Sequence, residues 1–192
     1  MKESTTELQK KIKKCLDKER YRHTLGVAYT ASALAMRYGE DTEKAFIAGL
    51  LHDCAKCIPN DEKYRMCEEY GISLSKSEQE IPSLVHAKLG AYLARERYGI
   101  EDEDIISSVR THTTGEPAMS LLQKIIFTAD YIEPNRSEAP NLAVVRQEAF
   151  EDLDSGVYRI LSDTLKYLDR KGGKIDPMTK ETYEYYKKRR EG

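Results

Sequence analysis

The sequence lacks a long apolar run, an excess of charge of either sign and a secretory leader. Its longest uninterrupted apolar runs are far shorter than the roughly 20 residues that a membrane-spanning helix needs. Lysine and arginine number 31 against 33 aspartate and glutamate residues, so the net charge of -2 provides no basic field for nucleic acid. The N-terminal stretch MKESTTELQKKIKKCL is too charged for a secretory signal. We therefore expect a soluble cytoplasmic protein that binds neither nucleic acid nor a membrane.

Cysteine is also scarce, with four residues in a chain of 192. A chain of this length can bury a core and a pocket without covalent cross-links, so in the cytoplasm we expect thiols rather than disulfides. Cys54 and Cys57 form one C-x-x-C pair, but no second such pair supplies the further ligands of a zinc site. The favoured interpretation is two incidental helical thiols, and a redox or regulatory role is the alternative.

The apolar residues repeat with helical periodicity and no stretch alternates convincingly as a strand would, which predicts an all-α fold. We expect a first helix with Thr6 and Gln9 as a capping box. A further helix begins at Asp41 or Thr42 and is ended by Pro59. Further helices are expected near 61–70, 83–98, 102–112, 120–132 and 141–168 and from about residue 177, with a serine-rich loop at 73–80.

Histidine is scarce as well, and its four residues share one setting with two aspartates: each lies in or at the end of an expected helix, beside apolar or small residues. A core hydrogen bond explains any one of them. Jointly they would need many separate partners, whereas one divalent cation satisfies imidazole nitrogens and carboxylate oxygens together. The residues are His23, His52, His86, His112, Asp53 and Asp130.

The adjacent pair His52 and Asp53 limits where such an ion can lie. Neighbouring helical residues point about 100° apart, so both can reach one ion only at a helix end or at the edge of a core-facing stripe. The position just before CAKCIP suits a helix end. His23 from the preceding helix and Asp130 from a later one would complete the ligand shell from other walls of a helical bundle.

The order His23, His52-Asp53, Asp130 resembles the H…HD…D signature of the HD-domain phosphohydrolase superfamily. In addition, YRHTLGVA, AGLLHDCAK, HAKLGA, HTTG and KIIFTADYIEPNR resemble successive blocks of the YqeK-type proteins, the symmetrical bis(5'-nucleosyl)-tetraphosphatases, which hydrolyse diadenosine tetraphosphate to two ADP. The resemblance spans residues 20–178, most of the chain. The first signature is specific for the superfamily only, whereas TADYIEPNR together with RTHTTG is more specific for the family.

The resemblance implies a single HD domain over 1–192, with a core at 18–170 and a C-terminal segment, 171–192, that contributes to the nucleotide site. It implies an iron ion, in a centre of one or two metals, although the ligand types equally permit manganese or another divalent metal. The implied metal ligands are His23, His52, Asp53 and Asp130, and the implied catalytic residues are Asp53, His86 and His112. His86 and His112 would face the phosphates or a second metal, and they are the best candidates for the general acid.

Basic and polar residues next to these positions are the expected substrate contacts. Arg20, Lys56 and Arg136 each lie close to an expected ligand in the sequence and match positions of the family. The glycine-containing stretch after the long helix is the expected adenine site. The full expected set is Arg20, Lys56, Cys57, Ile58, Pro59, His86, His112, Thr113, Arg136, Gly173, Lys174, Ile175, Asp176, Pro177 and Met178.

The C-terminal segment departs from the family pattern. Asp176-Pro177 stands where His-Pro is common, and Tyr183-Glu184 stands where Arg-Asn is common, which affects the expected base recognition and the contacts of a homodimer. Two alternative functions remain open at this point. One is an HD phosphohydrolase for another nucleotide or a guanosine alarmone, and the other is a nucleotide-binding regulator without turnover.

Overall fold

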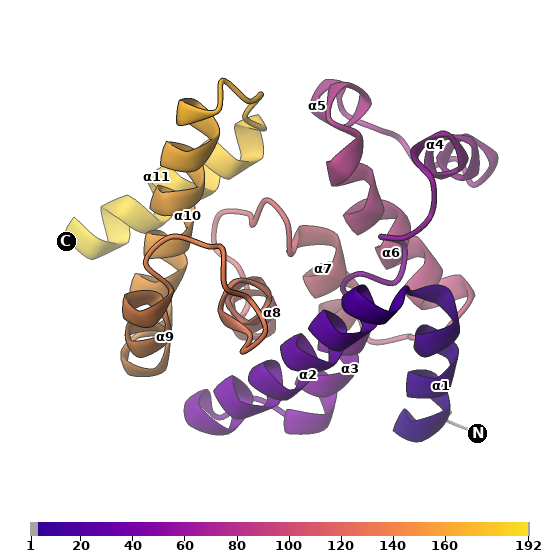
Figure 1. The fold of residues 1–192 in the computed structure, drawn as a ribbon, viewed down its shortest axis with the longest axis horizontal. Coiled ribbons are helices and arrows are strands. Elements are labelled where there is room, and N and C mark those ends of the chain that lie inside the picture. Colours follow the sequence, from indigo (N-terminus) through magenta and orange to yellow (C-terminus); the bar gives the residue numbers. More distant parts are fainter. Residues whose placement is uncertain (1–3, 192) are drawn as a thin grey trace.

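The computed structural model describes residues 4–191, and within this range every regular element is a helix, which confirms the all-α prediction (Figure 1). No helix in the described range is long and apolar enough to cross a membrane. The helices are α1 (Thr5–Cys15), α2 (Lys18–Tyr38), α3 (Thr42–Leu51), α4 (Asn60–Glu69), α5 (Lys76–Glu80), the short 3-10 helix η1 (Pro82–Leu84), α6 (Val85–Glu96), α7 (Glu103–Thr111), α8 (Leu121–Ile132), α9 (Leu142–Glu151), α10 (Leu153–Arg170) and α11 (Pro177–Glu191).

The start of α1 differs from the prediction. Ser4, and not Thr6, is the N-cap, and its hydroxyl oxygen accepts a hydrogen bond from the backbone N–H of Glu7 at 3.3 Å. The spacing of Ser4 and Glu7 is the same as that of Thr6 and Gln9, so the sequence offers two overlapping capping patterns. The predicted cap Asp41 is confirmed, because its carboxylate accepts from two backbone N–H groups at the start of α3.

The end of α3 determines how the site is built. This helix ends at Leu51 and not at Pro59, and residues 52–57 follow as a run of turns. Backbone hydrogen bonds from Cys54 N to Leu51 O at 3.0 Å and from Lys56 N to Asp53 O at 2.9 Å hold this run. The His-Asp pair at 52–53 therefore lies just past a helix end, as the geometry of two adjacent ligands requires.

Two further predictions were wrong in detail. The expected helix over 141–168 is two helices, because Asp152 takes an extended conformation (φ -145°, ψ 110°) and its carboxylate caps α10 by accepting from the N–H groups of Asp154 and Ser155. The expected loop at 73–80 contains α5, which begins with a complete capping box of Ser75 and Glu78.

The helices pack around one cluster of buried apolar side chains. In Figure 1, α7 and α8 lie in the middle, with α9, α10 and α11 on one side and α4, α5 and α6 on the other, while α2 and α3 run together across the base. Gly49 permits the close approach of α2 and α3, since a Cβ atom at this position would lie 2.6 Å from the Cα atom of Ala28. This contact lies one helical turn from His52. The packing of α2 on α3 therefore brings His23 and His52 towards each other.

Candidate metal centre

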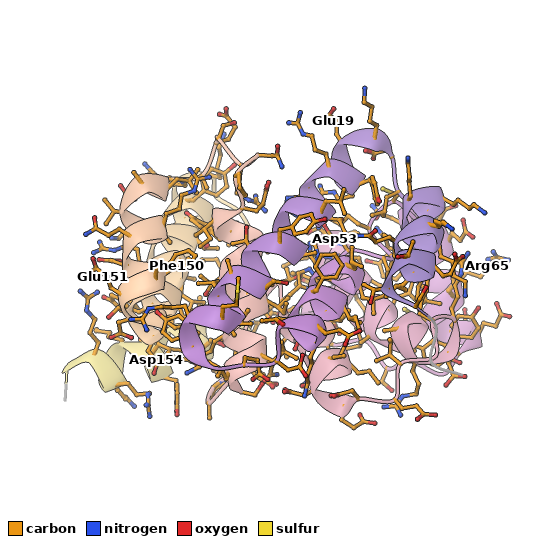
Figure 2. The ribbon with its side chains drawn as sticks, turned by 90° about the horizontal axis from the view of Figure 1, so that it is seen from below. Glu19, Asp53, Arg65, Phe150, Glu151 and Asp154 are labelled. Atoms are coloured by element: carbon orange, nitrogen blue, oxygen red, sulfur yellow. The ribbon has the colours of Figure 1, made fainter. Side chains whose placement is uncertain are left out.

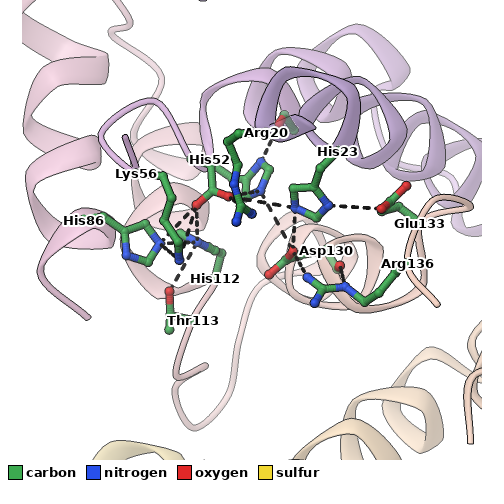
Figure 3. Close-up of polar contacts among 12 residues, drawn as sticks. Arg20, His23, His52, Lys56, His86, His112, Thr113, Asp130, Glu133 and Arg136 are labelled. Atoms are coloured by element: carbon green, nitrogen blue, oxygen red, sulfur yellow. Dashed lines mark hydrogen bonds and ion pairs between the residues drawn. The ribbon is translucent and has the colours of Figure 1, made fainter. Parts of the chain in front are cut away.

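The six residues singled out in the sequence meet in the interior of the bundle, although they come from five separate segments of the chain. Figure 3 shows the four histidines and Asp130 facing one another. His23 projects from α2 and Asp130 from the last turn of α8. The other three histidines and Asp53 lie at or next to helix ends: His52 and Asp53 follow α3, His86 lies in the first turn of α6, and His112 follows α7. Figure 2 shows Asp53 inside the molecule, whereas Glu19 and Arg65 project from its surface.

These side chains form two adjacent groups that could each hold a cation. His23, His52 and Asp130 make one group, and Asp53, His86 and His112 the other, with the ligand atoms of each group within 4.8 Å of one another. Asp53 faces both. Its Oδ2 lies 3.3 Å from His52 Nε2 and 3.9 Å from His23 Nε2, whereas its Oδ1 lies 3.1 Å from His86 Nε2 and 3.7 Å from His112 Nε2.

Three of the four imidazoles are oriented by the main chain. The Nδ1 atoms of His52, His86 and His112 bond to the carbonyl oxygen of the residue three positions earlier, at 2.7, 2.5 and 2.7 Å. A carbonyl accepts only, so each Nδ1 carries the hydrogen and each Nε2 presents a lone pair. All three lone pairs are directed at the space around Asp53.

Several polar atoms at this centre have no hydrogen-bond partner among the described residues. His23 Nε2, His52 Nε2 and Asp53 Oδ1 are buried and have no hydrogen-bond partner within the described chain. The Nε2 atoms of His86 and His112 lie 3.1 Å apart, although the bonds of both Nδ1 atoms make both of them acceptors. Buried acceptors without donors are costly, and divalent cations held by the two groups would satisfy them. The donor set thus fits a metal ion.

The carboxylates are held in the form that a metal binds. Burial alone would raise the pKa of Asp53, but the neighbouring histidines outweigh burial and hold its pKa well below the usual value. The pKa of Asp130 is likewise lowered: burial opposes this shift, while the close contact with His23 Nε2, at 3.0 Å, and the charge of Arg136 favour it. Burial lowers the pKa of His86 to about 4, so this imidazole is neutral near pH 7. Ionised carboxylate and neutral imidazole are the ligand forms of these groups.

Three basic side chains expected to bind phosphate border the centre (Figure 3). Arg20 Nη1 donates to Asp53 Oδ2 at 2.9 Å, and Arg136 Nη2 donates to Asp130 Oδ1 at 2.8 Å. Lys56 Nζ lies 3.3 Å from His86 Nε2. All three side chains are about one-third exposed, at 33, 35 and 32%. They therefore line the side of the centre that opens to solvent.

A cavity of 390 Å³ lies beside this centre, and Thr113 belongs to both. The Thr113 hydroxyl lies 3.2 Å from His112 Nε2. Of the stretch expected to bind adenine, Asp176, Pro177 and Met178 line the cavity, at the start of α11. Lys88 and Arg110, which are outside the expected set of substrate contacts, also line the cavity and pair there with Glu78 and Glu116.

The remaining expected substrate contacts lie elsewhere. Gly173, Lys174 and Ile175 do not line the cavity, and Lys174, in the connection between α10 and α11, pairs with Glu80 of α5 at 2.9 Å. Cys57, Ile58 and Pro59 lie in the connection between α3 and α4 and are likewise outside its lining. The thiol of Cys57 is exposed and donates to Asp17 Oδ2 at 3.4 Å.

The two thiols of the C-x-x-C pair should differ strongly in reactivity. Cys54 is buried, and burial raises the pKa of its thiol to about 12, so about one molecule in ten thousand carries the reactive thiolate at pH 8. Cys57 is exposed. We expect iodoacetamide to label Cys57 at least about a hundredfold faster than Cys54 in the folded protein, measured by mass spectrometry of peptides. Denatured protein, in which both thiols label equally, is the control, and equal labelling in the folded state would contradict the burial of Cys54.

Comparisons with known proteins agree with this geometry. The family model described as HD domain matches residues 20–135. A protein of Halalkalibacterium halodurans named symmetrical bis(5'-nucleosyl)-tetraphosphatase is 44% identical over 176 residues, which cover 90% of this chain and 91% of that protein. A Bacillus subtilis protein of the same name is 40% identical, over 91% of this chain and 92% of that protein. Among solved structures, a predicted HD superfamily hydrolase from Clostridium acetobutylicum, described as involved in NAD metabolism, superposes with a TM-score of 0.93 at 40% identity, covering 98% of this chain and 100% of that one.

Proposed function

This chain belongs to the HD domain family, and from that premise we propose that it is a metal-dependent hydrolase that cleaves diadenosine tetraphosphate symmetrically into two ADP. The observation that carries the proposal is the match, over about nine-tenths of both chains, to relatives named symmetrical bis(5'-nucleosyl)-tetraphosphatases. The cluster of histidine and aspartate side chains supports it, because the cleavage of a phosphoanhydride by water needs a cation at the reacting phosphates.

The centre is proposed to hold two metal ions that share Asp53. His23, His52, Asp53 and Asp130 hold the first ion, and Asp53, His86 and His112 hold the second. The two-sided contacts of the Asp53 carboxylate support this arrangement, as does the lowered pKa of His86, which favours a ligand over a proton donor. Iron is the proposed metal, and manganese fits the same donors. When bound, the metal supplies an activated water molecule and positive charge beside the phosphates.

The protein's own side chains bind and orient the substrate. Arg20, Lys56 and Arg136 lie at the solvent-facing side of the centre, where they can neutralise the charge of the tetraphosphate. Arg20 and Arg136 pair with the proposed ligands Asp53 and Asp130, so the approach of a phosphate would exchange one anionic partner for another. The reaction consumes one water molecule, breaks the central P–O–P bond and leaves one ADP on each side of it.

One adenosine of the substrate is proposed to occupy the cavity beside Thr113. Asp176, Pro177 and Met178 provide its wall on the α11 side, and the Thr113 hydroxyl connects the cavity with the centre. The helices after residue 135 belong to the same unit in this proposal, since Val145, Val157 and Leu161 are part of the common buried core. We place this single HD domain in the cytoplasm, where nucleotides of this kind occur as small-molecule substrates.

The identity of the products tests the proposal. Protein loaded with iron or manganese should release ADP alone from diadenosine tetraphosphate, at two molecules per substrate, as measured by anion-exchange chromatography. ATP and AMP in equal amounts would show asymmetric cleavage and would refute the symmetrical assignment. Tight binding of ADP without turnover under every metal would instead support a nucleotide-binding regulator. Preferred turnover of a deoxynucleotide or a guanosine alarmone would indicate a different HD phosphohydrolase.

A further inference from the structure

His23 differs from the other three histidines in where it lies along its helix. His52, His86 and His112 occur at or next to helix ends, so the carbonyl oxygen three residues earlier is free to accept from their Nδ1. His23 is the sixth residue of α2, a helix of 21 residues. Carbonyl oxygens in a helix interior accept from the N–H four residues later and are not available in the same way. The hydrogen-bond acceptor for His23 Nδ1 must therefore come from another element.

Glu133 supplies this acceptor. It follows the last residue of α8, its side chain is only 2% exposed, and its Oε1 lies 3.1 Å from His23 Nδ1. The second carboxylate oxygen, Oε2, accepts from the backbone N–H of Asn135 at 2.7 Å and from its side-chain amide at 3.0 Å. Both oxygens thus accept hydrogen bonds, on opposite sides. A carboxylate fits this position, whereas an amide would place its NH₂ group against one set of donors.

A glycine in α2 makes room for this carboxylate. Gly26 lies one turn after His23, and a Cβ atom at this position would collide with Glu133 Oε2 and lie 3.1 Å from the Asn135 amide nitrogen. The Glu133 side chain therefore lies directly against the backbone of α2. Because Gly26 and His23 are on the same face of the helix, the space that glycine leaves and the imidazole that Glu133 orients belong to one arrangement.

We propose that Glu133 is a positioning residue of the metal centre: it fixes the tautomer and orientation of His23 and makes its Nε2 the strongest nitrogen donor among the four histidines. This inference rests on the proposed metal site, in which His23 is a ligand. A carboxylate that accepts from the remote nitrogen of a ligating imidazole raises the basicity of that imidazole, whereas a carbonyl does so less. Gly26 is the residue that allows Glu133 to reach His23.

Metal affinity in the absence of substrate tests the inference. We expect Glu133→Gln to bind Mn²⁺ about 10-fold to 100-fold more weakly than the unaltered protein, by isothermal titration calorimetry, because loss of an outer carboxylate typically has this effect. Glu138→Gln, an exposed glutamate in the same connection, is the matched control and should leave the affinity unchanged. Glu133→Ala should weaken binding at least as much.

A double-mutant cycle separates positioning from a general structural role. Gly26→Ala should weaken Mn²⁺ binding by displacing Glu133, but the same change should have little further effect once Glu133 is alanine. Because the buried amide of Glu133→Gln faces a donor, thermal unfolding of this variant gives the temperature range in which it is fully folded, and a positioning role predicts that the loss of Mn²⁺ affinity persists within that range.

Wild-type Mn²⁺ affinity in Glu133→Gln would overturn the inference, and so would strict additivity of the two changes. An unaltered protein that binds no divalent metal would overturn it too. A protein that binds Mn²⁺ in the expected order of variants but leaves diadenosine tetraphosphate intact would refute the proposed function alone. If Glu133→Ala fails to fold, the Mn²⁺ affinities of Glu133→Gln and Gly26→Ala still test the inference.

Discussion

Replacing Asp53 by alanine should remove the bound metal and the hydrolytic activity together. This carboxylate faces both ligand clusters, through Oδ2 on one side and Oδ1 on the other. Its loss takes a ligand from each ion of the proposed centre. A bound cation stabilises transition-state charge by several kcal/mol, and about 1.4 kcal/mol corresponds to tenfold, so we expect turnover to fall about a thousandfold or more.

The measurement is the metal content of purified Asp53→Ala by elemental analysis, together with its rate of ADP release. Asp61→Ala, which alters an exposed aspartate in the first turn of α4, is the matched control and should behave as the unaltered protein. Asp53→Asn keeps the shape of the side chain and tests the charge alone. If Asp53→Ala retained its metal in full, the assignment of Asp53 as a shared ligand would be wrong.

Replacing His112 by alanine should remove one ion and leave the other. His112 belongs to the cluster with Asp53 and His86, and its Nε2 lies 3.7 Å from Asp53 Oδ1. The group of His23, His52 and Asp130 does not include it. The unaltered protein saturated with metal should therefore contain two ions per chain and His112→Ala one, with a loss of turnover of about a hundredfold or more.

Elemental analysis after removal of free metal gives the count, and reconstitution of chelated protein with stepwise Mn²⁺ gives the number of equivalents that restore activity. Gln147→Ala, an exposed residue of α9, controls for the preparation and should keep two ions. A saturated unaltered protein with one ion would contradict the shared centre and would return His112 to the role of proton donor. Loss of both ions from His112→Ala would show that the two clusters do not bind independently.

The sequence predicted the helical fold and the meeting of the six ionisable residues for a specific reason. Histidines are few in this chain, and all of them lie among apolar residues, where separate partners for each would be hard to provide. The periodicity of apolar residues locates helices but not their breaks, because the pattern continues through Asp152 although the backbone there is extended. For the same reason it did not predict that α3 ends at Leu51, before the His-Asp pair.

The detailed contacts within and behind the centre could not be predicted from the sequence. In the sequence, Glu133 looks like an ordinary charged residue at a helix end before a proline. Only the packing of α8 on α2 brings its carboxylate to the Nδ1 atom of His23. The division of the ligands into two groups depends on the orientation of the Asp53 carboxylate, which the sequence around it does not determine. The stretch 171–178 was expected to form the adenine site as a whole, yet its first half only follows the end of α10, where Gly172 adopts φ +62°. Asp176, Pro177 and Met178 alone among these residues line the cavity.

The contact of Gly49 with Ala28 means that the separation of His23 and His52 is set by two main chains and not by side-chain packing. A main-chain contact has no alternative rotamers, so the backbones of α2 and α3 are held at one separation behind the two imidazoles. An added methyl group at Gly49 would push α2 away from α3 and move His23 away from His52. Gly49 itself is not one of the proposed ligands or substrate contacts. The metal affinity of a Gly49→Ala variant would therefore measure how far the ligands can be displaced before the centre stops binding metal.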